Sequence, residues 1–122
     1  MYTIFKIRAK QIFLKILVIF FFSSCSLKEI NKPSPQINKI KLNEKFRINL
    51  PENHSNGNIW QLSDDYDANI LQKTNSVWHG NENGVDFNFN TLAKGQTTLT
   101  FIARKYSDTT DVKHFIVQIM PK

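Results

Sequence analysis

The sequence is poor in the residues that cross-link a chain or break its regular structure. Its 122 residues include one cysteine, four glycines and four prolines. A single cysteine excludes an intrachain disulfide. The length is sufficient for one domain, and no internal repeat is visible. A folded domain in this chain therefore has to be stabilised by a hydrophobic core.

Residue sets with the spacing of a catalytic or metal site are also missing. His54, His79 and His114 fall in separate predicted loops and strands, without the spacing of zinc ligands. The sequence has no Ser–His–Asp motif and no glycine-rich phosphate-binding loop. We therefore expect no enzymatic activity, no metal and no cofactor.

Acidic residues are absent from the first 24 positions, although the chain has a formal charge of +6. Because four basic residues fall in that segment, the remaining chain has 12 basic and 10 acidic residues and a net charge of +2. Its longest basic run is Arg104-Lys105. Nucleic-acid binding needs several basic side chains on one face. The sequence shows no such cluster, so we expect no nucleic-acid partner.

The first 24 residues have the order of parts of a secretory signal. Basic residues precede the apolar run Ile16–Phe22, and the small residues Ser23 and Ser24 follow it. The run is shorter than the roughly 20 apolar residues of a membrane-spanning helix. We therefore predict a helical signal peptide over residues 1–24, and the alternative is an uncleaved N-terminal anchor. The basic residues of this segment are Lys6, Arg8, Lys10 and Lys15.

Cys25 follows this segment and resembles the cysteine of the bacterial lipobox, with Phe22 and Ser24 at the motif positions before it. The resemblance implies cleavage after Ser24, acylation of Cys25 and stable attachment to a membrane. The alternative is a free cysteine behind a plain secretory signal. Ser26, where an inner-membrane lipoprotein would have Asp, favours the outer membrane. We expect a protein of the cell envelope, on its periplasmic or surface face, with residues 25–36 as acylated cysteine and tether.

From Ile37 onward, apolar and polar residues alternate with period two, and no helical period is sustained. Polar breaks separate about seven short apolar runs. The pattern predicts one all-β domain, a β-sandwich of six or seven strands, over residues 37–122. The side chains expected in its core are Phe46, Ile48, Leu50, Trp60, Leu62, Val85, Phe87, Phe89, Leu99, Phe101, Phe115, Val117 and Ile119.

Three polar loops interrupt this pattern at residues 53–58, 80–84 and 105–111. In a sandwich with this strand order they emerge at one end of the domain. Immunoglobulin-like folds commonly use that end for recognition. The alternative is that these loops are only turns.

The segment from Ile40 to Met120 resembles the chagasin family, immunoglobulin-like inhibitors of papain-like cysteine proteases. Three stretches carry the resemblance. Asn53, Gly57 and Trp60 match the family pattern N-P-T-T-G followed by Trp, with His54, Ser55 and Asn56 in place of its Pro and two Thr. Gly80 to Gly84 precedes an F-x-F strand at Val85–Phe89. Leu92 to Phe101 is similar to the family's L-K-x-G-x-T-x-L segment.

The resemblance implies a wedge of three loops that enters the active-site cleft of a host or endogenous papain-like protease. The residues implied to contact the protease are Asn53, His54, Ser55, Asn56, Gly57, Gly80, Gly84, Lys105 and Tyr106. The family's third motif, Arg-Pro-aromatic, falls at Lys105-Tyr106-Ser107, which keeps the charge and a neighbouring ring. Since the first loop lacks the family's proline, we expect it to be less preorganised. We expect a monomer. The alternative function is a non-inhibitory binding or adhesion module of the envelope.

Overall fold

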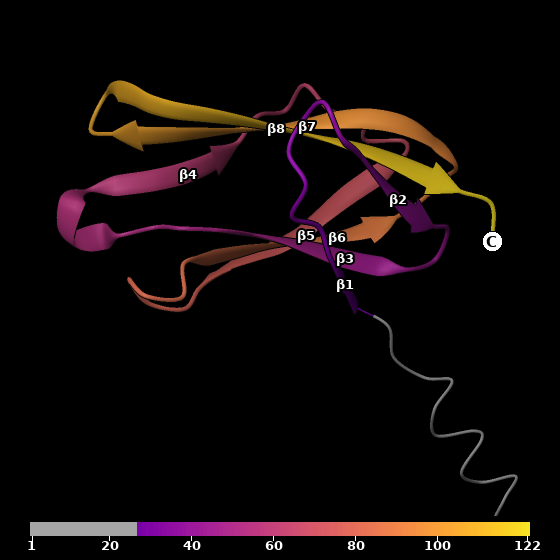
Figure 1. Cartoon of the computed structure of the whole chain (residues 1–122), viewed down its shortest axis with the longest axis horizontal. Coiled ribbons are helices and arrows are strands. Elements are labelled where there is room, and N and C mark those ends of the chain that lie inside the picture. The colour runs from indigo at the N-terminus through magenta and orange to yellow at the C-terminus, as the bar shows by residue number, and fades with distance from the viewer. Residues whose placement is uncertain (1–26) are drawn as a thin grey trace, which may run out of the picture.

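The computed structural model describes residues 27–122, which form two four-stranded sheets packed face to face (Figure 1). One sheet has the strand order β1-β3-β6-β5 and the other β2-β8-β7-β4. The predicted all-β sandwich is therefore confirmed, and the predicted signal helix and Cys25 lie outside the described residues. No helix in residues 27–122 is long and apolar enough to cross a membrane. The strands are β1 (Leu27–Glu29), β2 (Ile37–Lys41), β3 (Lys45–Leu50), β4 (Asn58–Leu62), β5 (Leu71–Trp78), β6 (Val85–Thr91), β7 (Gly95–Lys105) and β8 (Asp108–Met120).

Alternation along β6 shows how the sequence forms these sheets. Phe87 and Phe89 point inward and lie opposite Ile48 and Phe46 of the antiparallel strand β3. The rings of Phe46 and Phe89 stack, with their centroids 5.0 Å apart. Such cross-strand pairs fix the register, because a shift by one residue would turn every apolar side chain outward.

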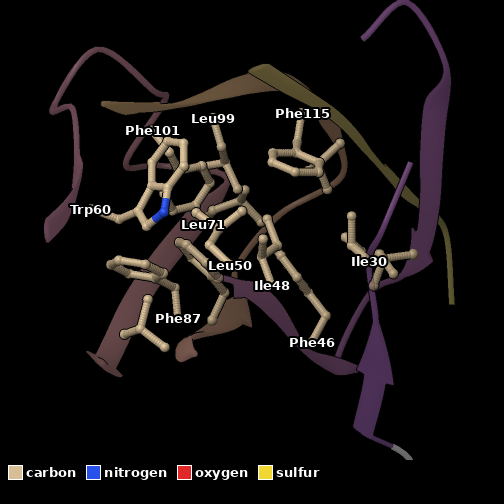
Figure 2. Close-up of a cluster of buried hydrophobic side chains, with 14 of the residues drawn as sticks. Ile30, Phe46, Ile48, Leu50, Trp60, Leu71, Phe87, Leu99, Phe101 and Phe115 are labelled. Carbon is tan, nitrogen blue, oxygen red and sulfur yellow. The ribbon is translucent and has the colours of Figure 1, made fainter. Parts of the chain in front are cut away.

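The core lies between the two sheets, where aromatic side chains from both layers meet (Figure 2). The Phe87 ring of β6 lies 4.9 Å from that of Phe101 on β7, and the Phe101 ring lies 5.7 Å from that of Phe115 on β8. All the predicted core residues are buried except Leu62, which is partly buried. Leu71, at the start of β5, is fully buried as well.

The N-terminal boundary of the domain differs from the predicted one. Leu27–Glu29 pairs in parallel with β3, and the next residue, Ile30, is 3% exposed and part of the core. The chain then crosses to the other sheet and forms β2. The prediction of a tether up to residue 36 is therefore wrong from Leu27 onward. The segment was missed because it buries a single large apolar side chain, which gives no alternation to detect.

The connection between β7 and β8 is also shorter than predicted. Lys105 pairs with Asp108, so the turn consists of Tyr106 and Ser107 instead of a loop that extends to Asp111. Arg104 pairs with Thr109, next to an irregularity in the register at Ala103. β-Branched threonines favour extended backbone even where both faces of a hairpin are solvated.

Candidate functional site

Three connections meet at one end of the sandwich, on the left in Figure 1. They follow β3, β5 and β7, and we call them the first loop (residues 51–57), the second loop (residues 79–84) and the hairpin turn (residues 106–107). Together they form what we call the loop end. The second loop and the hairpin turn lie on either side of the first loop.

The first loop contains a single turn of 3-10 helix, His54–Asn56. The side chain of Asn53 caps this turn, since its Oδ1 accepts a hydrogen bond from the Ser55 N–H at 2.9 Å. Gly57 ends the turn in the left-handed conformation, with φ of 73°, and its N–H donates to the His54 carbonyl oxygen at 3.1 Å. The loop is therefore a compact, hydrogen-bonded turn.

A buried carboxylate ties this turn to the sandwich. Glu52 is 5% exposed. Its Oε1 accepts the backbone N–H of Trp60 on β4 at 2.8 Å, and its Oε2 lies 2.8 Å from His54 Nε2. Burying a carboxylate is costly unless its oxygens are hydrogen-bonded. Here both oxygens have partners, and one of them, His54, belongs to the loop itself.

The second loop and the end of β5 restrain the first loop from the side. The His54 ring stacks on Trp78, with the centroids 3.8 Å apart and the planes at 12°. The backbone N–H of His54 donates to Asn81 Oδ1 at 3.0 Å, and Asn81 Nδ2 donates to Ser55 Oγ at 2.9 Å. The Trp78 indole N–H donates a long hydrogen bond of 3.4 Å to the Glu52 backbone carbonyl oxygen. These contacts restrain a loop that lacks the proline of the family pattern.

The second loop depends on a close approach of two backbones. Gly84 has φ of 71°, and a Cβ at this position would lie 2.2 Å from the Leu50 carbonyl oxygen. No other residue fits without a shift of the chain. The loop therefore lies directly against the end of β3, where the first loop begins.

Asp86, just after this loop, is buried and hydrogen-bonded. It accepts from Asn49 Nδ2 at 2.8 Å, and its other oxygen lies 2.8 Å from His79 Nε2. Burial by itself raises the pKa of Asp86. The hydrogen bonds from Asn49 and His79 and the charges of His79 and Arg47 outweigh burial and lower the pKa below its ordinary value of 3.8. The aspartate is thus ionised in the folded protein at neutral pH.

The hairpin turn brings an exposed aromatic ring beside the first loop. Tyr106 is 87% exposed and has φ of 57°. Its Cζ lies 3.9 Å from the position that a Cβ on Gly57 would occupy. Thr110 of β8 also approaches Asn58, with 3.4 Å between Thr110 Oγ1 and Asn58 Oδ1. The second loop therefore contacts the first loop, and the hairpin turn lies next to it.

Comparison with known proteins gives structural neighbours for this arrangement. No family model matches the sequence, and no curated protein matches it. Among solved structures, the cysteine protease inhibitor EhICP2 from Entamoeba histolytica has a TM-score of 0.62 at 16% identity, over 77% of this chain and 93% of that one. The solution structure of amebosin has a TM-score of 0.55 at 14% identity, over 77% of this chain and 96% of that one. The chain has a chagasin-like fold.

Within this chagasin-like fold, the residues predicted to contact a protease lie together at the loop end. Asn53 to Gly57 form the first loop, Gly80 and Gly84 bound the second, and Lys105 and Tyr106 lead into the hairpin turn. Their role in binding stays a prediction. Glu52, Trp78 and Asn81 position the first loop, and their role was not predicted from the sequence. The available signal was Trp78, a large aromatic residue at the end of a strand that is exposed from Gln72 onward.

Proposed function

We propose that the chain inhibits papain-like cysteine proteases by inserting its loop end into the active-site cleft. The observation that supports this most is the meeting of three loops at one end of a chagasin-like fold, with the first loop held by the contacts of His54 with Trp78 and Asn81. A loop that is rigid before binding loses little conformational entropy on binding.

The chemistry of the loop end suits such a cleft. The first loop presents backbone groups, small polar side chains and Gly57, so it can approach a cysteine–histidine pair closely and satisfy its polar groups. Tyr106 supplies an exposed aromatic ring at the side, and Tyr is among the residues that most often dominate binding energy in interfaces. Inhibitor interfaces of this kind bury about 800 Å² on each partner.

The proposed location is the bacterial cell envelope, where acyl chains on Cys25 attach the protein to a membrane, with the outer membrane as the favoured site. The resemblance of Phe22–Cys25 to the lipobox supports this proposal. Mass spectrometry of the protein from membranes tests it, since a chain that begins at an acylated Cys25 is expected. A chain that keeps residues 1–24, or an unmodified thiol at Cys25, would contradict it.

The test of inhibition uses residues 26–122, which include every residue of the hydrophobic core, from Ile30 to Ile119. We expect competitive inhibition of papain that Tyr106→Ala weakens by roughly tenfold or more, since an aromatic anchor often contributes more than about 2 kcal/mol. Tyr106 is almost fully exposed, so the free energy of unfolding should change little. Leu92→Ala is the matched control, because Leu92 is 48% exposed but follows β6, away from the loop end.

A second candidate is a non-inhibitory binding or adhesion module. It is favoured by the short hairpin turn, which presents Lys105, Tyr106 and Ser107 without the family's proline and following aromatic residue. Absence of inhibition across a panel of papain-like proteases, together with capture of an envelope structural protein, would support this candidate.

A further inference from the structure

Five exposed lysines gather along one edge of the sandwich. The basic edge consists of Lys28 on β1, Lys32 in the crossover, Lys39 and Lys41 on β2, and Lys45 at the start of β3. β1 and β2 are the outermost strands of the two sheets on the same side of the molecule, and the crossover joins them (Figure 1). The fold thus brings together lysines that form no run in the sequence.

The charge of this edge is largely uncompensated. Residues 27–47 contain six basic and two acidic side chains, whereas residues 48–122 contain six basic and eight acidic ones. The two acidic residues of the first group are already paired: Glu29 lies 3.6 Å from Arg47, and Glu44 lies 3.7 Å from Lys28. Among residues 27–122, the ion pairs involve none of the other four lysines of the basic edge.

A hollow of about 320 Å³ lies between β1 and β2 in this edge. Three lysines, Lys28, Lys32 and Lys39, and one acidic residue, Glu29, are among the residues that line it. Glu29 is already paired with Arg47, so the lining has an excess of positive charge, which favours a phosphate group. Both acidic protein surfaces and phospholipid headgroups carry negative charge and could bind such a site. The position of the edge in the chain indicates which of the two partners is favoured.

The chain ties this edge to its most apolar segment. Leu27, the first residue of β1, pairs with Lys45. The apolar run ends at Phe22, five residues earlier, and Cys25 is two residues earlier. Fully extended, these stretches span at most about 18 Å and about 7 Å. The shorter distance is within the Debye length of about 8–10 Å at physiological salt. Attachment through this segment therefore brings the start of β1, with Lys28 and Lys45, within electrostatic reach of lipid headgroups.

We propose that the basic edge is a membrane-facing surface that binds anionic phospholipid headgroups, with the hollow between β1 and β2 receiving a headgroup phosphate. β1 starts beside Lys45, at the end of β3 away from the first loop, so attachment through the residues before β1 directs the loop end away from the bilayer. The inference depends on the proposed membrane attachment and is independent of protease inhibition.

Vesicle sedimentation of residues 26–122 tests the headgroup contact without the anchor. Binding is expected to vesicles of phosphatidylcholine mixed with phosphatidylglycerol, and not to phosphatidylcholine alone. Neutralising Lys32→Gln and Lys39→Gln together should weaken binding roughly tenfold to thirtyfold. Lys73→Gln with Lys94→Gln is the matched control, because it removes the same charge from exposed positions outside the edge and should have a much smaller effect.

Several results would overturn the proposal. These are absence of binding to the anionic vesicles, equal binding to neutral ones, and equal losses in the two double variants. Salt-sensitive binding to an acidic protein or to DNA, without vesicle binding, would assign the edge to another partner.

The orientation is tested with the full chain in vesicles of brominated lipid. Trp78, the exposed one of the two tryptophans, lies at the loop end and should keep its fluorescence, and strong quenching would contradict the orientation.

Discussion

At the scale of single residues, the stacking of His54 on Trp78 adds to the hydrogen bonds that restrain the first loop. The two rings lie 3.8 Å apart and nearly parallel, and Trp78 is 43% exposed, so it contributes to the loop more than to the core. Stacked aromatic pairs stabilise by about 0.5–1.5 kcal/mol beyond the area they bury. The loop is therefore sensitive to a residue outside it, at the end of β5.

Trp78→Ala should accelerate hydrogen exchange of the His54 and Gly57 amides and weaken protease inhibition about tenfold, because the loop becomes ordered only on binding. The thermal midpoint should change little. Trp78→Phe keeps a stacking ring and should retain most of the inhibition and of the amide protection. Val77→Ala, on the same strand, is the control. Unchanged amide exchange in Trp78→Ala would show that the stack does not position the loop.

Asp86 makes the stability of the domain depend on pH in the acidic range. Its pKa is below 3.8 in the folded protein, so its contribution to stability is complete above that pH and is lost as the pH falls through the folded pKa. Asp86→Asn should lower the free energy of unfolding at neutral pH by about 1–2 kcal/mol and flatten the loss of stability below pH 3.8. Asp65→Asn removes the same charge from an exposed position and is the control in urea titrations. Parallel acid curves for wild type and Asp86→Asn would refute this assignment.

At the scale of elements, β1 is an integral part of the sandwich. Ile30, which follows it, is buried between the sheets (Figure 2), so removing its side chain should leave a cavity. Ile30→Ala is expected to lower the free energy of unfolding by about 2–4 kcal/mol. Ile37→Ala, at a position that is 45% exposed, should cost less than about 1 kcal/mol. Equal effects of the two substitutions in urea unfolding would return residues 27–36 to the role of a tether.

The strands that the sequence predicts are those with one buried and one solvated face. Phe87 and Phe89 alternate with polar residues, so their strand is evident from the sequence, and so are its partners. β1 cannot be predicted in this way, because its own residues are exposed and only Ile30, which follows it, is buried. The hairpin around Tyr106 escapes it for a different reason: both of its faces are solvated there, so threonines and charged residues follow one another without alternation.

The site is predictable in its position and less so in its internal contacts. The polar breaks in the pattern locate all three loops, and strand order then places them at one end. The contact of His54 with Trp78 joins residues 24 positions apart in the chain. It depends on how the ends of β3 and β5 lie beside each other, which no local pattern specifies. The same is true of the bond between Glu52 and the Trp60 N–H.

At the scale of the whole molecule, the domain has two distinct regions. The loop end is a hydrogen-bonded group of three connections with an exposed tyrosine, and the basic edge includes the place where the chain begins its first strand. A protein attached to a membrane through its N-terminal segment would expose the first region and cover the second. This arrangement suits an inhibitor that meets proteases at an envelope surface.

Protection of a protease's catalytic cysteine from alkylation tests the central claim most directly. Papain is mixed with an excess of residues 26–122, treated with iodoacetamide, and the modified thiol is measured by mass spectrometry. We expect the wild-type domain to protect the catalytic thiol and the Tyr106→Ala domain to protect it much less. A catalytic cysteine that is alkylated at the same rate with and without the domain would show that the loop end does not occupy the active-site cleft.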